Sequence, residues 1–156
     1  MTRISKVKGQ RIDIMNDKPV IVGIVLNAPI EKVWEAITDK GKMKQWYFNI
    51  AEFNPEPGFE FSFRAGEEDK EYLHVCKITE VKPGKKLTHS WRFENYEGLS
   101  HVTWELFLEA GKTRLKLTHT GIETFPADNP DFAKKNFNEG WNQIIRTSLK
   151  NYVEKN

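Results

Sequence analysis

The chain has 156 residues, of which 38% are hydrophobic, 29% charged and 12% aromatic. This composition excludes a disordered chain and a membrane protein, and the length is that of one domain, residues 1–156. The formal net charge of +2 is too small for a protein that holds nucleic acid through its overall field, so we expect no nucleic-acid partner. One cysteine, Cys76, excludes an internal disulfide and a cysteine-rich zinc site.

The N-terminal residues give two further expectations. Met1 is not followed by the apolar stretch of a signal peptide, and no apolar run approaches the about 20 residues that a spanning helix needs. We therefore expect a cytoplasmic protein with no transmembrane association. Residues 1–18 carry several basic side chains before the first acidic one, Asp13, and fit either a basic arm or an edge strand.

The first regular elements are a strand and a helix. Residues 20–26 form a β-branched run that predicts a buried strand. Asn27-Ala28-Pro29 ends this strand and opens a helix, with Pro29 suited to the first helical position. Apolar residues recur at helical spacing over 30–37 and give the helix one buried stripe. Gly41 is expected to end it, and residues 42–46 predict a second short helical turn.

Residues 47–120 alternate between apolar and polar positions, which predicts a series of strands joined by tight turns. Lys82-Pro83-Gly84-Lys85 has Pro and Gly at the two central positions that a type II turn favours. The inner face of the predicted sheet carries most of the rings. Its members include Phe61, Phe63, Leu87, His89, Trp91, Phe93, Val102, Trp104, Leu106, Leu115, Leu117 and His119.

A long helix is predicted at the C-terminus, over residues 131–153. Asn129-Pro130 suits its N-cap and first helical position, and one stripe of apolar residues follows from Phe137 to Tyr152. Gly140 lies inside this helix at a cost of about 1 kcal/mol relative to Ala, which a close approach of the helix to the sheet would explain.

An antiparallel sheet with so many rings on one face must be covered, and only the C-terminal helix is long enough to cover it. We therefore predict an α+β helix-grip fold: a curved antiparallel sheet of about six or seven strands wraps around a long C-terminal helix, with one or two short helices after the first strand. This arrangement leaves a cavity between sheet and helix, and the connection 120–130 is expected to form its mouth.

Several short motifs occur in the order and spacing of a known family. They are Asn27-Ala28-Pro29-Ile30-Glu31-Lys32-Val33-Trp34, Trp46, Pro57-Gly58, the run from Thr79 to Leu87, Ser90-Trp91, Val102-Thr103-Trp104, Thr113-Arg114-Leu115, His119-Thr120-Gly121 and Gly140-Trp141. Over about residues 20–154 the chain resembles the START-like (birch-pollen-allergen-like, SRPBCC) superfamily, and within it the C-terminal domain of the activator of the heat-shock protein 90 ATPase. The resemblance implies the helix-grip fold, with members that bind lipids or other apolar molecules, cyclise polyketides or act as co-chaperones.

We predict that rings of the sheet and residues of the terminal helix line the cavity. The expected ligand-binding residues are Trp46, Phe61, Phe63, His89, Trp91, Phe93, Trp104, His119, Trp141, Ile145, Ser148 and Tyr152. In this interpretation Trp141 faces Trp91 and Trp104 across the cavity. The alternative is that the rings simply fill the core, although stiff rings are hard to pack without voids.

Three histidines, His74, His89 and His119, fall on the inner face of their strands. No metal-ligand spacing or acidic partner accompanies them, so we interpret them as separately hydrogen-bonded and expect no metal and no cofactor. The glutamates of the strands alternate with apolar residues and fall on the outer face. We therefore expect no catalytic residue.

These patterns leave three hypotheses. The first is a non-enzymatic protein that binds an apolar or amphipathic small molecule in the cavity. The second is a co-chaperone-type regulatory module that docks on a chaperone ATPase, with the lysines of residues 40–44 and 82–86 as a surface for an acidic partner or anionic headgroups. The third is a cyclase- or hydrolase-type enzyme that uses His119 or Tyr72 as acid or base.

Overall fold

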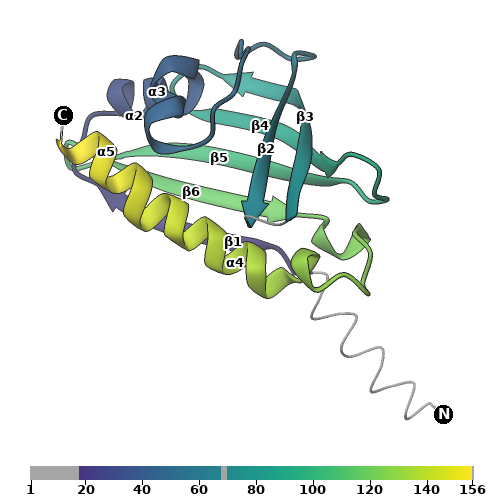
Figure 1. The fold of residues 1–156 in the computed structure, drawn as a ribbon. Helices are drawn as coiled ribbons and strands as arrows, with labels where there is room; N and C mark the ends of the chain where they lie inside the picture. Colours follow the sequence, from purple (N-terminus) through teal and green to yellow (C-terminus); the bar gives the residue numbers. More distant parts are fainter. Residues whose placement is uncertain (1–17, 68–69, 156) are drawn as a thin grey trace.

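The computed structural model describes residues 18–67 and 70–155, so the expectation for residues 1–18 lies almost wholly outside the described residues. Six antiparallel strands form one curved sheet in the order β1-β6-β5-β4-β3-β2 (Figure 1). They are β1 (Val20–Leu26), β2 (Glu60–Glu67), β3 (Lys70–Lys82), β4 (Lys86–Phe93), β5 (Ser100–Glu109) and β6 (Lys112–Thr120). The first strand pairs with the last, and the other pairs join strands adjacent in the chain.

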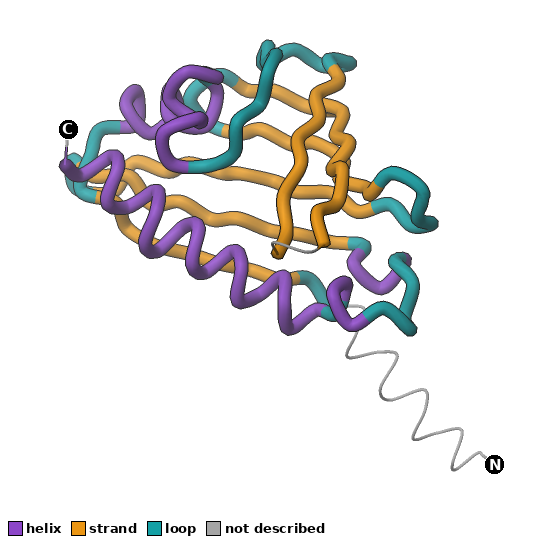
Figure 2. Tube along the Cα trace, viewed as in Figure 1, coloured by secondary structure: helices purple, strands orange, loops and turns teal. Residues whose placement is uncertain are grey.

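Helices cover one face of this sheet. After β1 come α2 (Ile30–Thr38) and α3 (Lys40–Trp46), and after β6 come the 3₁₀ turns η1 (Ile122–Thr124) and η2 (Pro130–Phe132). The C-terminal helix consists of α4 (Lys134–Gln143), the π-helical η3 (Ile144–Leu149) and α5 (Lys150–Lys155). It runs beside β1 while α2 and α3 sit at one end of the sheet (Figures 1 and 2). The predicted α+β helix-grip fold is confirmed.

The alternation of the strands builds the core as predicted. Leu87, Trp104, Leu117 and Val22 stand opposite one another on four neighbouring strands, and all four are buried. Burying apolar side chains of this size stabilises the fold by about 1.5–3 kcal/mol each. The turn after β3 also has the predicted form, because Lys85 N donates to Lys82 O and Gly84 takes a φ of 75°.

The helices after β1 begin and end slightly off the predicted positions. Pro29 precedes α2 as its cap rather than occupying its first turn, and α2 ends at Thr38. Asp39 then caps α3 by accepting a hydrogen bond from Lys42 N. Gly41 therefore lies inside α3 and does not end the first helix.

The C-terminal helix starts later than predicted and is not α-helical throughout. Asn129 caps the short turn η2 and the helix proper begins at Lys134. Four buried residues of this helix are spaced by four positions: Trp141, Ile145, Leu149 and Val153. Because an α-helix has 3.6 residues per turn, such a row gradually rotates around the helix and away from the sheet. The wider turns of the π segment counteract the drift and keep this row on the sheet.

Gly140 does not mark a close approach of helix and sheet, and that expectation is wrong. A Cβ atom at this position would meet no atom within 4 Å. The glycine instead leaves space on the inner side of α4. None of the helices in the described residues has the length and apolar character to cross a bilayer.

Candidate functional site

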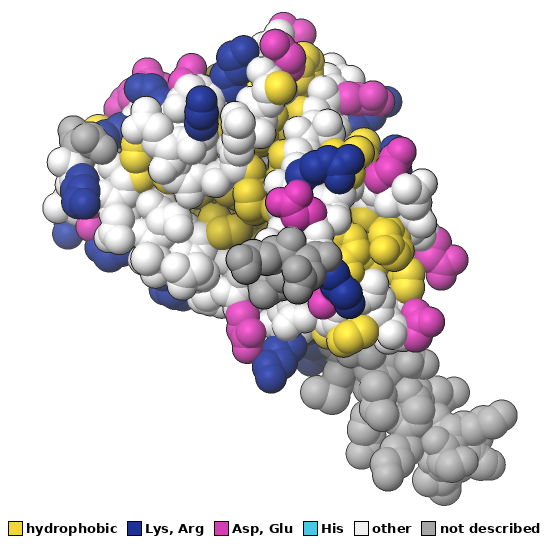
Figure 3. All heavy atoms as spheres, viewed as in Figure 1, with side chains coloured by type: hydrophobic (Ala, Val, Ile, Leu, Met, Phe, Trp, Pro, Cys, Tyr) yellow, Lys and Arg dark blue, Asp and Glu magenta, His cyan; other side chains and the backbone are white. Residues whose placement is uncertain are grey.

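A pocket of about 570 Å³ lies between the sheet and the first turns of the C-terminal helix. The sheet contributes residues of β2, β3 and β4, and the opposite wall comes from η2 and α4. Its lining consists of Phe48, Ala65, Gly66, Lys70, Tyr72, His74, Trp91, Phe93, Asp131, Phe132, Asn136, Phe137, Glu139, Gly140, Trp141 and Ile144. Hydrophobic side chains gather on this face between β2 and the helix (Figure 3). Half of the lining residues carry rings, as is common in small-molecule sites.

Three of the predicted lining residues border this pocket: Trp91, Phe93 and Trp141. The three tryptophans do not face one another across the cavity as expected, because the Trp141 ring lies 5.5 Å from that of Trp91 and 5.6 Å from that of Trp104, in direct contact with both. Trp104 contacts Trp141 from the far side and does not itself line the pocket.

Of the other predicted residues, all but the half-buried Ser148 and Tyr152 are buried in the core. Trp46, Phe61, His89 and Trp104 surround a second space of only about 10 Å³, which is at the lower limit for one water molecule. Phe63, His119, Ile145, Ser148 and Tyr152 border neither space. The inner face is thus filled at the end covered by α2 and α3 and hollow at the end beside η2.

Two groups of lining residues were missed. His74 is predicted on the inner face and Tyr72 as a possible acid or base, but neither is among the predicted lining residues, and Phe137 is predicted only as part of the helix stripe. Phe48 lies between α3 and β2, and Phe132 lies in η2, before the helix stripe that begins at Phe137, so only their aromatic character could have pointed to them.

The mouth is not formed by residues 120–130, contrary to the expectation. The rim consists of the facing ends of β2 and β3 on one side and of η2 and α4 on the other. Phe125, from the expected loop, packs 5.1 Å from Phe93 and 5.7 Å from Phe132 and so backs the pocket wall. Ile122 and Phe125, two apolar residues of this loop, are buried.

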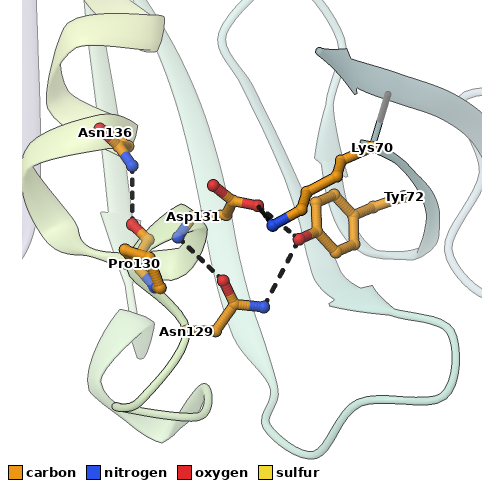
Figure 4. Close-up of polar contacts among 6 residues, drawn as sticks. All are labelled: Lys70, Tyr72, Asn129, Pro130, Asp131 and Asn136. Atoms are coloured by element: carbon orange, nitrogen blue, oxygen red, sulfur yellow. Dashed lines mark hydrogen bonds and ion pairs between the residues drawn. The ribbon is translucent and has the colours of Figure 1, made fainter. Parts of the chain in front are cut away.

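A polar cluster joins the two sides of the rim (Figure 4). The Tyr72 hydroxyl donates to Asp131 Oδ2 at 2.6 Å and accepts from Asn129 Nδ2 at 3.4 Å. Lys70 Nζ lies 3.9 Å from the same carboxylate oxygen. The hydrogen bond to Asp131 raises the pKa of Tyr72, so the hydroxyl stays protonated at neutral pH and keeps its role as donor.

His119 belongs to a chain of hydrogen bonds behind the pocket. Its Nδ1 accepts from Trp141 Nε1 at 2.9 Å, which assigns the ring proton to Nε2. Nε2 donates this proton to Ser100 Oγ, 2.8 Å away, and the serine hydroxyl in turn donates to Trp91 O. Burial lowers the pKa of His119 from 6.5 to about 3, so the ring is neutral. Both ring nitrogens are thus engaged in structural hydrogen bonds, and the ring borders no pocket among the described residues.

The other two inner histidines are also held separately, as predicted. His89 Nε2 accepts from Trp104 Nε1 at 3.2 Å, and its Nδ1 donates to Ser90 O. His74 Nδ1 donates to Tyr72 O at 2.9 Å. Burial lowers the pKa of both rings from 6.5 to about 4. Within residues 18–67 and 70–155, no three His, Cys, Asp or Glu side chains converge as metal ligands would.

Two buried polar atoms have no partner in the described part of the chain: Tyr47 Oη and Trp91 Nε1. Tyr47 borders the space of about 10 Å³, where no ligand fits. Trp91 borders the large pocket.

The lysine clusters are partly neutralised by their neighbours. Lys40 lies 3.6 Å from Glu52, and Lys42 lies 3.2 Å from Glu35. In the second cluster, both Lys82 and Lys86 pair with Glu80. These exposed pairs contribute little to stability, but they reduce the positive field that an acidic partner would meet.

Solved structures with the same fold come from several bacteria. CV1439 from Chromobacterium violaceum superimposes with a TM-score of 0.74 at 21% identity, over 88% of this chain and 97% of that one. BH1534 from Bacillus halodurans gives a TM-score of 0.68 at 24% identity, over 87% and 96%. DynU16, a protein in the dynemicin biosynthetic locus, superimposes with a TM-score of 0.72 at 23% identity. The match covers 88% of this chain but only 48% of DynU16. At these identities the likeness establishes the fold.

The sequence itself matches a family over most of its length. None of the curated proteins matches the chain. Residues 27–154 match the family described as "Activator of Hsp90 ATPase homolog 1-like protein". This range begins just after β1 and ends within α5, so it includes both walls of the pocket. The chain belongs to this family, within the START-like superfamily of helix-grip proteins.

Proposed function

We propose that this protein is a non-enzymatic binding protein for an apolar or amphipathic small molecule, which it holds in the pocket between the sheet and the C-terminal helix. The observation that carries the proposal is the space of about 570 Å³ among rings whose counterparts at the other end of the sheet enclose only about 10 Å³. Native interiors leave few voids larger than a water molecule, so a hollow of this size is a specific feature of one end of the core.

The chemistry of the wall supports binding rather than turnover. His74 is neutral at pH 7, and the Tyr72 hydroxyl is engaged with Asp131. Burial raises the pKa of Cys76, so its thiol stays protonated and is a poor nucleophile. Tyr72 and His74 are thus already used in structural hydrogen bonds, and Cys76 lies outside the pocket lining.

Native mass spectrometry of freshly purified protein tests the proposal first, by detecting a co-purified small molecule. Titration with alkylbenzenes of increasing chain length, followed by tryptophan fluorescence, tests it independently. Each buried methylene contributes about 0.8 kcal/mol, so affinity should rise about fourfold per methylene until the pocket is full. The proposal fails if the protein carries no molecule and the fluorescence shows no saturable change with any member of the series.

A co-chaperone role is the second candidate, and the family description is the observation that favours it. It requires that the protein raise the ATP turnover of a cognate Hsp90-type chaperone, with an effect that weakens in salt if exposed lysines carry the contact. Replacing Lys40, Lys42 and Lys44 by Glu should weaken it further. Unchanged turnover at a saturating concentration of the protein rejects this role for the isolated chain.

A further inference from the structure

The buried polar groups of the pocket wall are paired, with one exception. Trp141 Nε1 donates to His119, and His74 Nδ1 donates to Tyr72 O. The Tyr72 hydroxyl is held by Asp131. Trp91 Nε1 has no acceptor within the described residues, and only 5% of this residue is exposed to solvent.

The other buried tryptophans show that this fold normally supplies an acceptor. Trp46 Nε1 donates to Ala36 O at 2.8 Å, Trp104 Nε1 to His89 at 3.2 Å, and Trp141 Nε1 to His119 at 2.9 Å. Trp91 is the one buried tryptophan without such a bond in the described residues, and its ring borders the pocket. Because an unpaired buried donor is costly, an acceptor from outside the chain is the natural partner.

The surroundings of Trp91 are aromatic. The ring of His74 meets it edge-on at 4.9 Å, and those of Trp141 and Phe63 lie at 5.5 Å and 5.8 Å. The large aliphatic side chain in the pocket lining is Ile144. An aromatic guest adds edge-to-face and offset-stacked contacts to such a wall, which an acyl chain cannot do.

The pocket also offers no buried positive charge among the described lining residues. His74 is neutral, because burial lowers its pKa to about 4. Lys70 is at the rim, with 66% of its side chain exposed and Asp131 nearby. A carboxylate drawn into this wall would lose its hydration without gaining a counter-ion.

We infer that the pocket takes a neutral aromatic molecule that carries a hydrogen-bond acceptor, such as a ketone oxygen, and that Trp91 donates its indole N–H to this oxygen. The inference rests on the proposed function and narrows it to one class of ligand. Trp91 Nε1 is shielded from solvent, so the guest reaches it by displacing one of the rings packed against the indole.

Three tricyclic probes of matched shape test this inference. Fluorene and 9-fluorenone share their rings and differ only in a CH₂ group that becomes a carbonyl, while fluorene-9-carboxylate adds a charge. Their dissociation constants are measured by equilibrium dialysis for the wild-type protein, for Trp91→Phe and for Trp104→Phe. The last variant is the control, because it removes an indole N–H that does not border the pocket.

We expect the wild type and Trp104→Phe to bind 9-fluorenone about tenfold more tightly than fluorene, the gain from one good hydrogen bond. Trp91→Phe should lose this preference, and fluorene-9-carboxylate should bind more weakly than fluorene. In ¹⁵N-labelled wild type, the fluorene and 9-fluorenone complexes should differ chiefly in the indole N–H resonance of Trp91, a readout that holds even if Trp91→Phe fails to fold.

The outcomes separate the inference from the function on which it rests. Equal affinity for fluorene and 9-fluorenone, a preference that survives Trp91→Phe, or tightest binding of the carboxylate would overturn the inference and leave the proposed function standing. Absence of binding by all three probes would overturn both.

Discussion

Trp141 donates its indole N–H to Nδ1 of His119 across 2.9 Å, and this bond ties the C-terminal helix to β6 at the back of the pocket. Both residues are buried, with exposed fractions of 2% and 0%. The helix wall of the pocket is therefore fixed by a polar contact as well as by packing. A donor and an acceptor buried together depend on each other, because either one alone pays for its lost hydration.

We predict that Trp141→Phe lowers the free energy of unfolding by about 1–3 kcal/mol, since it leaves His119 Nδ1 without a partner. His119→Leu should be destabilising by a similar amount. Because each single change strands the other residue, the double variant should be more stable than the sum of the two effects implies, by about 1 kcal/mol or more. Urea denaturation of the four proteins provides the cycle, and strictly additive effects would show that the bond is not what couples helix and strand.

Acid should destabilise the fold before its carboxylates titrate. Burial lowers the pKa of His74 and His89 from 6.5 to about 4 and that of His119 to about 3. The unfolded chain therefore binds more protons than the folded one below pH 6.5, and stability is lost as the pH falls from about 6.5 towards 4. Each histidine contributes a slope of up to about 1.4 kcal/mol per pH unit.

The check is the free energy of unfolding in urea at pH 7.0, 6.0 and 5.0. His74→Phe serves as the comparison, because it removes one of the three titrating rings and should flatten the slope by about a third. A stability that does not change between pH 7.0 and 5.0 would mean that the three rings are not held neutral by burial.

The cluster at the rim should control how fast a ligand leaves. Tyr72→Phe removes the hydroxyl that bonds Asp131 across the mouth, so a bound fluorene should dissociate faster in stopped-flow displacement. The stability should fall by only about 0.5–1.5 kcal/mol, as for one hydrogen bond. Tyr96→Phe is the matched control, because its ring lies 5.5 Å from that of Tyr72 but its hydroxyl is outside the cluster. Identical dissociation rates for wild type and Tyr72→Phe would rule out this role.

Gly140 offers a test of the hollow that does not require a ligand. A Cβ at this position meets nothing within 4 Å, so Gly140→Ala should fit without strain. Because alanine is the better helix former, the variant should raise the free energy of unfolding by up to about 1 kcal/mol. Thermal and urea denaturation measure the change. Destabilisation would mean that the helix and sheet are too close at this point to leave a pocket.

The fold follows from the sequence because the signals that define it are periodic. Alternation places Leu87, His89 and Trp91 on one face, and the length of the terminal apolar stripe identifies the helix that covers them. Periodicity specifies which face is buried but not what fills the space above it. Trp104 meets the ring of Trp46, the last residue of α3, at 6.4 Å, whereas Trp91 and Phe93, on the same face of the sheet as Trp104, border the pocket.

The start and the internal geometry of the terminal helix could not be predicted from the sequence for a similar reason. Its early residues Asn129 and Pro130 suit the start of a helix, but they form a separate 3₁₀ turn before Lys134. The π segment from Ile144 keeps a row of buried residues spaced by four against the sheet, and no residue type in the sequence predicts it. The expectation of a close approach at Gly140 is wrong because a sequence does not distinguish a glycine beside a void from a glycine in close contact with another element.

Binding of a small apolar molecule in the pocket between sheet and helix can be tested by filling the pocket with a larger side chain. Tryptophan fluorescence is titrated with fluorene for the wild type, Gly140→Ala and Gly140→Leu, whose side chain extends from α4 into the pocket. We expect saturable binding of one fluorene by the wild type and Gly140→Ala, and binding at least about tenfold weaker by Gly140→Leu in a protein that remains folded. If Gly140→Leu binds fluorene as tightly as the wild type, or if none of the three proteins shows saturable binding, the pocket is not the binding site.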